Sequence, residues 1–444
     1  MSLPRYPRYK DSGVEWLGEV PEHWGVDRLR WSIRVARNGV WGDEAKEDEN
    51  DIPCIRVADF DRQRLRVKLE DPTIRNIRAS DREGRIAERN DLFLEKSGGG
   101  ELQPVGCVVL YDDDAPTVCS NFIALVKLAS SMDASYWRYV HSTAYGVGLN
   151  TRSIKQTSGI QNLDQQQYLD EQGPFPPPDE QAAISRFLDR ESSKIDALVE
   201  EQRRLIELLK EKRQAVISHA VTKGLNPNAP MKPSGIDWLG DVPAHWDVRR
   251  AKRLFVEIDK RSAAGEEEML TVSHITGVTP RSEKNVNMFE AETNEGYKLC
   301  WPGDLVINTL WAWMGAMGVA PISGMVSPAY NVYRSRGGLL PDYIDFVVRM
   351  PRFAQEVTRF SKGVWSSRLR LYPEGFFEVF LPSPPPKEQV EIASYLSSEN
   401  AKCDSLIVEA NRAIALLQER RSALISAAVT GKIDVRGLAR QEVA

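Results

Sequence analysis

The stretch Ser12-Gly-Val-Glu-Trp-Leu-Gly-Glu-Val-Pro-Glu-His-Trp24 recurs 222 residues later as Ser234-Gly-Ile-Asp-Trp-Leu-Gly-Asp-Val-Pro-Ala-His-Trp246. A second block, Pro176-Pro-Pro-Asp-Glu-Gln181, recurs 208 residues later as Pro384-Pro-Pro-Lys-Glu-Gln389. This second register runs without a gap to an Ala-Val-Thr sequence at 220–222 and again at 428–430. Self-similarity of this kind indicates a duplicated structural unit. We call the first repeated block A, the second B and the segments between them X and Y. The chain therefore has the order A–X–B–A′–Y–B′.

The two segments that fill this frame are unlike each other. Segment X spans about 25–175 and segment Y about 247–383, and they share little sequence. A repeated frame that carries two different inserts indicates one task performed on two targets. The alternative to this functional interpretation is gene duplication followed by sequence drift. Drift, however, would have changed the A and B blocks as much as the inserts.

Each Pro-Pro-Pro sequence is expected to lead into a long helix, over about 179–221 and 387–429. Proline suits the approach to a helix, and acidic residues suit its N-terminus. At about 1.5 Å per residue, each helix would be on the order of 60 Å long. Apolar steps of 3, 4 and 7 predict a coiled-coil seam, so we expect the helices to pack on each other as a spacer. The alternatives are a plain structural hairpin or a homodimer zipper. The predicted seam residues are Ile184, Leu188, Ile195, Leu198, Leu205, Leu209, Ile392, Leu396, Leu406, Leu417 and Leu424.

Composition limits the class of protein. The five cysteines are far apart and form no C-x-x-C pair, which favours the reducing cytoplasm and neither zinc nor disulfides. The net charge of −5 counts against simple DNA binding, because phosphate neutralisation needs basic surface. An uncharged stretch over 305–333 contains many turn residues, so it predicts strand–turn–strand and no membrane span.

X and Y contain short apolar runs broken by turn residues, which predict mixed α/β domains. Helical pieces are expected at 135–142 and 342–360. Two polar loops in each domain have side chains suited to phosphates and base edges: Arg pairs with guanine, Asn or Gln with adenine, and glycine permits close backbone approach. For any single candidate residue, the alternative to DNA contact is a solvated loop side chain. For the two tryptophans, the alternative is packing within the domain. The candidates are Lys96, Ser97, Gly98, Gly99, Gly100, Gln103, Arg152, Lys155 and Gln156 in X, and Asn308, Thr309, Trp311, Trp313, Lys362, Ser366, Ser367, Arg368 and Arg370 in Y.

The sequence carries no recognisable catalytic motif. The zinc-protease H-E-x-x-H, the P-loop and the G-x-S-x-G elbow are missing, as is an adenine-methyltransferase Asn/Asp-Pro-Pro-aromatic tetrad. His23 and His245 are repeat mates beside Trp24 and Trp246, a pattern that indicates a structural anchor. We therefore expect a protein that is not itself an enzyme.

With its order established, the chain resembles the specificity subunit of type I restriction–modification systems. The matching parts are the two W-L-G-x-V-P-x-H-W blocks, the two P-P-P-x-E-Q helix starts and the two Ala-Val-Thr ends. The resemblance implies an α+β fold with two mixed α/β target recognition domains, two long antiparallel coiled-coil helices and a pseudo-twofold internal repeat. The implied divisions are 1–175 (first recognition domain), 176–224 (first helix), 225–383 (second recognition domain), 384–432 (second helix) and 433–444 (tail).

The resemblance also implies a mechanism. Each recognition domain would read one half of a bipartite site on double-stranded DNA, and the helices would set the gap between the halves. Two modification subunits would dock on the helices and bring S-adenosylmethionine, and restriction subunits would bring ATP and Mg. This chain would bind no cofactor. Partners that share the DNA contacts would also account for the acidic net charge.

Three other functions remain to be distinguished. A free-standing DNA-binding regulator would bind DNA tightly without partners. A coiled-coil scaffold would show no salt-dependent DNA binding. A nuclease would need an acidic or metal-binding constellation, and none is recognisable in the sequence.

Overall fold

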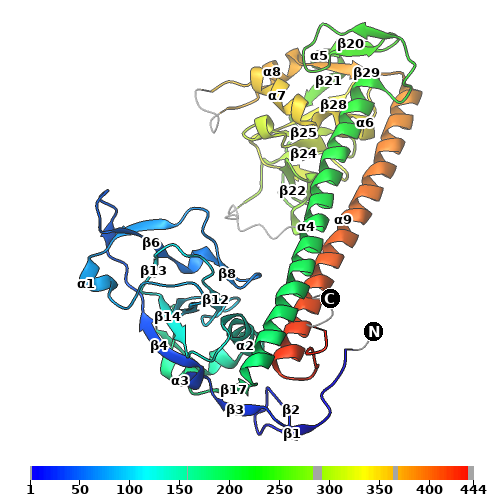
Figure 1. The fold of residues 1–444 in the computed structure, drawn as a ribbon. Helices are drawn as coiled ribbons and strands as arrows, with labels where there is room; N and C mark the ends of the chain where they lie inside the picture. Colours follow the sequence, from blue (N-terminus) through cyan, green and yellow to red (C-terminus); the bar gives the residue numbers. More distant parts are fainter. Residues whose placement is uncertain (1–2, 158, 284–292, 364–368, 439–444) are drawn as a thin grey trace. The chain divides into compact units, whose positions relative to one another are not determined.

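The computed structural model describes residues 3–157, 159–283, 293–363 and 369–438 (Figure 1). The chain divides into two compact units, and each is described by itself. Unit 1 comprises Met1–Arg203 and Asn411–Ala444, and unit 2 comprises Arg204–Ala410. Both chain ends therefore belong to unit 1.

Two long helices contribute to both units. Helix α4 runs over Pro178–Lys223 and helix α9 over Pro386–Val429, close to the bounds expected from the sequence. Each begins on a proline and ends before a left-handed glycine, Gly224 with φ +74° and Gly431 with φ +73°. Glycine reaches this conformation without the strain that a Cβ would cause, which explains these stop positions.

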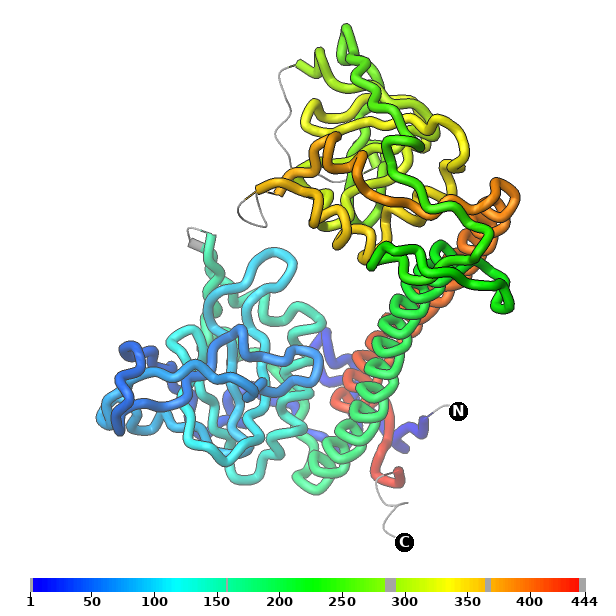
Figure 2. Tube along the Cα trace, turned by 90° about the horizontal axis from the view of Figure 1, so that it is seen from above, coloured from blue at the N-terminus to red at the C-terminus, as the bar shows by residue number. Residues whose placement is uncertain are grey.

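Within unit 1 the segments of α4 and α9 run antiparallel, and Figure 2 shows them side by side. Ile184 at the start of α4 shares a core with Ile425 at the end of α9. Further along, the carboxylate of Asp196 accepts a hydrogen bond of 2.6 Å from Nη1 of Arg421. Unit 2 repeats this contact, with Arg213 of α4 donating to Asp404 of α9. Both residues of the second pair lie 208 positions from their mates, so the duplication preserves the ion pair that fixes the helix register.

The seam prediction needs correction at three positions. Leu198, Leu205 and Leu406 are exposed, and Val199 and Ile206 are buried in their place. A straight helix has 3.6 residues per turn, so a strict 3.5-residue seam rotates away from the partner helix along its length. Of the other predicted seam residues, Leu417 and Leu424 are half-buried, whereas Ile184, Leu188, Ile195, Leu209, Ile392 and Leu396 are buried.

The domain of unit 1 is built on a six-stranded sheet in the order β4-β14-β10-β12-β8-β7. Its central strands are buried on both faces: Leu92 and Leu94 share a core with the spacer helices, whereas Phe93 lies in a second core on the other face. Burial on both faces explains the continuous apolar runs in the sequence. Its elements are β1 (Tyr9–Asp11), β2 (Glu19–Pro21), β3 (Gly25–Arg28), η1 (Leu29–Ser32), β4 (Ile33–Asn38), β5 (Asp43–Glu44), β6 (Asp51–Ile55), η2 (Val57–Asp59), β7 (Phe60–Asp61), β8 (Arg66–Val67), β9 (Thr73–Asn76), α1 (Ala79–Arg82), β10 (Leu92–Glu95), β11 (Ser97–Gly98), β12 (Val108–Leu110), β13 (Val118–Cys119), β14 (Ile123–Leu128), α2 (Ala134–Gly146), η3 (Leu149–Ser153), β15 (Ile154–Thr157), β16 (Ile160–Leu163), α3 (Gln165–Leu169) and β17 (Gln172–Phe175).

The domain of unit 2 repeats this plan with a four-stranded sheet, β21-β28-β25-β26. Leu305 and Ile307 face the core shared with the spacer helices, and Val306 faces a second core. Its elements are β18 (Met231–Pro233), β19 (Asp241–Pro243), β20 (Asp247–Arg250), α5 (Ala251–Leu254), β21 (Phe255–Ile258), β22 (Leu270–Ser273), β23 (Gly277–Pro280), η4 (Arg281–Glu283), β24 (Lys298–Cys300), β25 (Leu305–Asn308), η5 (Ala312–Met314), β26 (Met317–Val319), β27 (Gly324–Val326), β28 (Tyr330–Ser335), α6 (Pro341–Val348), α7 (Pro351–Arg359), α8 (Pro373–Glu378) and β29 (Phe380–Ser383).

The sequence expectations for local structure hold with one exception. The uncharged stretch 305–333 forms strands and turns, and among the described residues no helix is long and apolar enough to cross a membrane. The helix expected over 135–142 is present as α2. The helix expected over 342–360 is instead two helices, α6 and α7, because Pro351 has no N–H for the first and starts the second.

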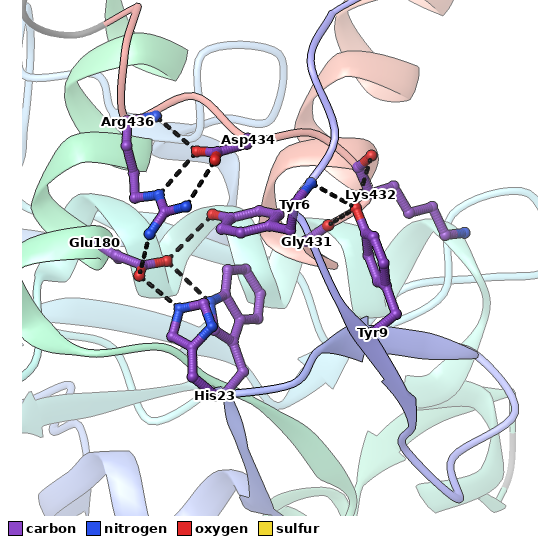
Figure 3. A network of polar contacts seen from close by, with 9 residues as sticks. Tyr6, Tyr9, His23, Glu180, Gly431, Lys432, Asp434 and Arg436 are labelled. Atoms are coloured by element: carbon purple, nitrogen blue, oxygen red, sulfur yellow. Dashed lines mark hydrogen bonds and ion pairs between the residues drawn. The ribbon is translucent and has the colours of Figure 1, made fainter.

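The repeated motifs meet at a buried carboxylate, shown in Figure 3. Glu180, in the first turn of α4, is 5% exposed and accepts hydrogen bonds from Trp24 Nε1 at 2.9 Å and from the Tyr6 hydroxyl at 3.2 Å. His23 Nε2 lies 2.6 Å from the other carboxylate oxygen, and Arg436 Nη1 lies 3.4 Å from it. The network therefore ties the N-terminal segment, α4 and the C-terminal tail together.

Unit 2 repeats the centre of this network without the chain ends. Glu388 of α9 accepts a bond of 3.0 Å from Trp246 Nε1 and lies 2.8 Å from His245 Nε2. The structural-anchor interpretation of the two histidines is therefore confirmed. In unit 2 the linker after Gly224 leads directly into β18, whereas in unit 1 the tail and the N-terminal segment meet by a backbone hydrogen bond of 2.8 Å between Asp434 N and Pro4 O.

The glutamine of the P-P-P-x-E-Q motif holds each domain to its helix. Gln181 accepts a hydrogen bond from the backbone N–H of Asp133, the residue that caps α2, at 3.1 Å. Gln389 accepts one of 2.8 Å from Leu340, the residue before α6. The adjacent glutamate and glutamine thus fix two different parts of each unit.

Replacement of Glu180 by alanine should destabilise unit 1 by about 3 kcal/mol, because the Trp24 and Tyr6 donors stay buried without an acceptor. Glu388→Ala is the matched control, since its carboxylate is more exposed and has two partners. Urea denaturation of the full chain, followed by tryptophan fluorescence, would compare them. Equal losses for both variants would contradict the larger role of Glu180.

Candidate nucleic-acid interface

In the first domain, a three-stranded sheet brings together the two loops predicted from separate parts of X. The order is β11-β16-β15. Ser97 of β11 and Lys155 of β15 both pair with Asn162 of the central strand, and Gly98 and Gln156 both pair with Gln161. The candidate residues 97–98 and 155–156 therefore belong to one small sheet, in which Ser97 and Lys155 share a face with Asn162 and Gln156 shares the opposite face with Gln161.

Neighbouring groups modify the charges on this surface. Lys96 is half-buried, which lowers the pKa of its amine, and its Nζ donates to Asn38 Oδ1 at 2.5 Å. Lys155 Nζ lies 2.7 Å from Asp164, whose carboxyl pKa is lowered by this hydrogen bond. Arg152 Nη2 lies 3.6 Å from the exposed Glu15. Lys155 and Arg152 thus each lie beside a carboxylate, which reduces the net positive charge that these two candidates present.

The triple glycine forms the tip of the same region. Gly99 has φ +57°, and a Cβ there would lie 2.9 Å from the backbone nitrogen of Val105. Gly100 and Gln103 pair with each other across a tight turn. Leu102 at the tip of this turn is fully exposed. The glycines therefore permit a close-packed turn that presents side chains outward.

The second domain also brings its two predicted loops together. Lys362 and Arg370 pair through backbone hydrogen bonds of 2.9 Å, and the N–H of Leu371 donates to Thr309 O at 3.1 Å. Asn308 and Thr309 are themselves buried, and the Thr309 hydroxyl donates to Ala329 O at 2.6 Å. The two residues therefore help to hold the loop in place, and their side chains are not exposed to solvent.

The two tryptophans of the second domain differ in burial: Trp313 is partly buried, whereas Trp311 is exposed. The rings of Trp311 and Trp313 stack with centroids 6.2 Å apart, and Trp313 Nε1 donates to Leu310 O at 3.1 Å. Trp311 is 51% exposed, so one ring face is open to a ligand. The candidates Ser366, Ser367 and Arg368 lie outside the described residues.

Sequence reasoning missed several residues on these surfaces. Gln161 and Asn162 form the central strand between the two predicted loops, and the exposed Phe122 accepts backbone hydrogen bonds from Lys96 and Ser97. Glu95 and Arg62 form a buried ion pair beside the glycine turn. Residues 160–163 read Ile-Gln-Asn-Leu, without the apolar–polar alternation that predicts a strand, and no local pattern joins residue 62 to residue 95.

The described residues contain no group of three or more His, Cys, Asp or Glu side chains placed to hold a metal ion. All five cysteines are buried as free thiols. The described residues of the candidate surfaces are thus hydrogen-bonding side chains on loops next to a buried core, an arrangement suited to recognition.

Comparison with known proteins gives one curated relative. No protein-family model matches the chain. Over 235 residues it is 23% identical to a protein of Methanocaldococcus jannaschii named as the MjaX type I restriction enzyme specificity subunit, with 52% of each chain covered. The chain thus spans about half the length of this relative.

Solved structures establish the fold over nearly the whole chain. A chain from work on complex assembly and conformational transition of the type I R-M system aligns with a TM-score of 0.67 at 14% identity, covering 92% of this chain and 98% of that one. The HsdS subunit from Thermoanaerobacter tengcongensis aligns with a TM-score of 0.54 at 15% identity, covering 93% and 98%. The predicted fold class, two mixed domains joined by two long helices, is confirmed. The resemblance drawn from the repeated blocks is also confirmed, since the curated relative is named as a type I restriction enzyme specificity subunit.

If the second domain reads one half of a bipartite site, replacement of the exposed Arg370 by alanine should relax base preference in that half only and cost about 1–3 kcal/mol. Lys362→Ala is the control, because Lys362 pairs with Arg370 through the backbone and its amine already lies 3.2 Å from Glu374. Competition among duplexes that vary one base at a time would measure both. Uniform weakening across all sequences by Arg370→Ala would instead identify a phosphate contact.

Proposed function

We propose that this chain is the DNA-recognition subunit of a type I restriction–modification complex and that it catalyses no reaction itself. Each domain reads one half of a bipartite duplex site. The supporting observation is the frame: two unlike loop surfaces are each fixed to the same pair of helices by the same Glu–Trp and Gln–backbone contacts. Such a frame holds two different readers in equivalent ways, which is what a split site requires.

The proposal extends to the partners and cofactors. Two modification subunits bring S-adenosylmethionine and the adenine methylation chemistry, and restriction subunits bring ATP and Mg. This chain holds none of these cofactors and acts with its partners in the cytoplasm. Shared phosphate contacts reconcile DNA binding with a net charge of −5. A free-standing regulator is less compatible with that charge, and a pure scaffold would not need two dissimilar loop surfaces.

The spacer helices carry matched exposed residues that suit two copies of one partner. Under the 208-residue register, seven exposed positions are identical in the two helices and follow one helical stripe: Lys194/Lys402, Leu198/Leu406, Glu201/Glu409, Arg204/Arg412, Leu208/Leu416, Glu211/Glu419 and Ala215/Ala423. Exposed positions off this stripe differ, as Glu200/Val408 and Glu207/Ala415 do. Solvent alone does not preserve a leucine on a surface, so the stripe supports a docking role.

Each unit exposes one leucine of the stripe from each helix. These are Leu198 and Leu416 in unit 1, and Leu406 and Leu208 in unit 2, all close to half exposed. Two equivalent patches on one chain are suited to two copies of the same subunit. Leu198 and Leu406, two of the three leucines that contradicted the intramolecular seam, therefore gain an explanation in docking.

Changing the two leucines of one patch to glutamate should remove one of two bound modification subunits. The buried face of each helix is untouched, and glutamate favours helix as leucine does. Thus Leu198→Glu with Leu416→Glu should leave one subunit bound, as should Leu208→Glu with Leu406→Glu, and all four changes should leave none. Native mass spectrometry would count the subunits.

The control for this docking experiment is Val408→Glu. Val408 is exposed on α9, and its mate in α4 is already glutamate, Glu200. It should still bind two subunits. Retention of two subunits by the four-leucine variant would show that docking uses another surface.

The function itself is tested by sequencing modified adenines after co-expression of the chain with a neighbouring methyltransferase. A split motif that depends on this chain is expected, with one half altered when residues 25–175 are exchanged and the other half altered when 247–383 are exchanged. Methylation of the same sites without the chain would refute the recognition role.

A further inference from the structure

One face of the small sheet β11-β16-β15 carries a row of three polar side chains. Ser97 of β11 and Lys155 of β15 both pair with Asn162 of the central strand, so the three lie side by side across the sheet. Burial alternates along β16: Ile160 and Asn162 are exposed, whereas Leu163 belongs to the domain core. The face that carries Asn162, here called the outer face, is therefore open to solvent.

The central strand β16 is fixed by contacts on its other face and at its backbone. Gln161 is buried, and its Oε1 accepts the backbone N–H of Val105, which follows the glycine turn, at 3.3 Å. The N–H of Leu163 donates to Lys96 O at 2.8 Å. Side chains on the outer face therefore project from a backbone that the rest of the domain holds in place.

The amide of Asn162 is oriented and still has groups available for a ligand. The Ser97 hydroxyl donates to Asn162 Oδ1 at 2.6 Å. An amide oxygen has two lone pairs and an amide nitrogen has two N–H donors, so this bond occupies only one position of four. Among the described residues, Asn162 Nδ2 has no hydrogen-bond partner. The side chain thus presents a donor and an acceptor next to each other on an exposed face.

The charged groups next to Asn162 are paired with each other. Lys155 Nζ lies 2.7 Å from the carboxylate of Asp164, which also caps α3 by accepting the N–H of Gln167 at 3.1 Å. Lys155 remains 71% exposed. A lysine amine binds phosphate as a point charge that needs no fixed direction, so Lys155 suits a backbone phosphate beside a base that Asn162 contacts.

We propose that Asn162 is a base-reading residue of the first domain and that its target is an adenine in the major groove. The inference rests on the proposed function. Asparagine pairs bidentately with adenine, with its oxygen accepting from N6 and its nitrogen donating to N7. A spacing of about 4.8 Å between strands places the outer strands of this sheet about 10 Å apart. That width is comparable with the major groove, which is about 12 Å wide and admits β-strands.

The first test compares Asn162→Ala with Gln166→Ala in the full chain bound to its methyltransferase. The first half-site is the half that changes when residues 25–175 are exchanged. Asn162→Ala should lower the preference for one adenine there, other than the methylated one, roughly 5- to 150-fold and leave the second half-site unchanged. Gln166 is an exposed amide on α3, so Gln166→Ala removes a similar group without a change of charge and should keep every base preference.

Competition among duplexes that vary one base pair at a time would measure these preferences. Equal weakening across all sequences by Asn162→Ala would identify a contact to the DNA backbone and overturn the inference. A first half-site with no A·T pair besides that of the methylated adenine would also overturn it.

A change in the DNA tests the contact directly. Replacement of the chosen adenine by 7-deazaadenine removes the N7 acceptor and keeps the Watson–Crick edge. The parent chain should bind the modified duplex more weakly, whereas Asn162→Ala should bind both duplexes equally, because it has no amide N–H to lose. Equal losses for the two proteins would show that another residue contacts N7, contrary to the inference.

A second variant guards against loss of folding. Asn162→Asp keeps an oxygen that accepts from Ser97 and removes both N–H donors. Because a carboxylate also accepts from N4 of cytosine, this variant should lose its preference for adenine over cytosine at the same position. Circular dichroism and the melting temperature should stay near those of the parent chain. If the variant folds and keeps its adenine preference, Asn162 is a structural residue of the sheet and the inference is wrong.

Failure of the proposed function would look different. If the parent chain directs no bipartite methylation, the recognition role fails before any variant is compared, and the role of Asn162 fails with it. If the parent chain directs bipartite methylation and Asn162→Ala changes no base preference, only the inference about Asn162 is overturned.

Discussion

The glutamate carboxylate in the first turn of each long helix, buried in Glu180 and half-buried in Glu388, makes the interaction on which the rest of the structure depends. Glu180 and Glu388 each accept the indole N–H of a tryptophan from the preceding repeated block, at 2.9 and 3.0 Å. A buried indole N–H needs an acceptor, and a buried carboxylate needs donors. The hydrogen bond between them therefore offsets the free-energy cost of burying both groups. The next residue, a glutamine, holds the backbone ahead of the first domain helix. One dipeptide thereby orients a mixed α/β domain on its helix.

This constraint explains why the repeated sequence is concentrated in a few short blocks. Tyr136 of α2 donates to the carbonyl of Val429, and Tyr343 of α6 donates to that of Val221, at 3.4 and 3.0 Å. The Ala-Val-Thr ends of the long helices therefore contact the domains that the Glu-Gln starts orient. The residues that make these contacts can therefore vary little in amino-acid type in either copy of the repeat. The strands and loops between them need only fill a core and present side chains, so they are free to diverge.

The sequence was sufficient to predict the frame, the two long helices and the mixed domains, because each depends on local signals: proline and glycine at helix ends, and apolar runs in buried strands. It could not identify the helix face correctly at Leu198 and Leu406, since the same leucine periodicity suits an internal seam and a docking stripe. It placed the recognition loops by composition and glycine content, and the three-stranded sheet β11-β16-β15 joins those of the first domain. It missed Arg62 because an ion pair between residues 62 and 95 is a product of tertiary packing.

The acidic net charge also has a physical explanation in these contacts. Many of the basic side chains near the candidate surfaces are paired with carboxylates: Lys155 with Asp164, Lys362 with Glu374 and Arg62 with Glu95. Paired cations attract phosphates weakly at long range but are held in defined orientations. A recognition subunit built this way would gain its selectivity from oriented donors and leave most of the nonspecific attraction to its partners.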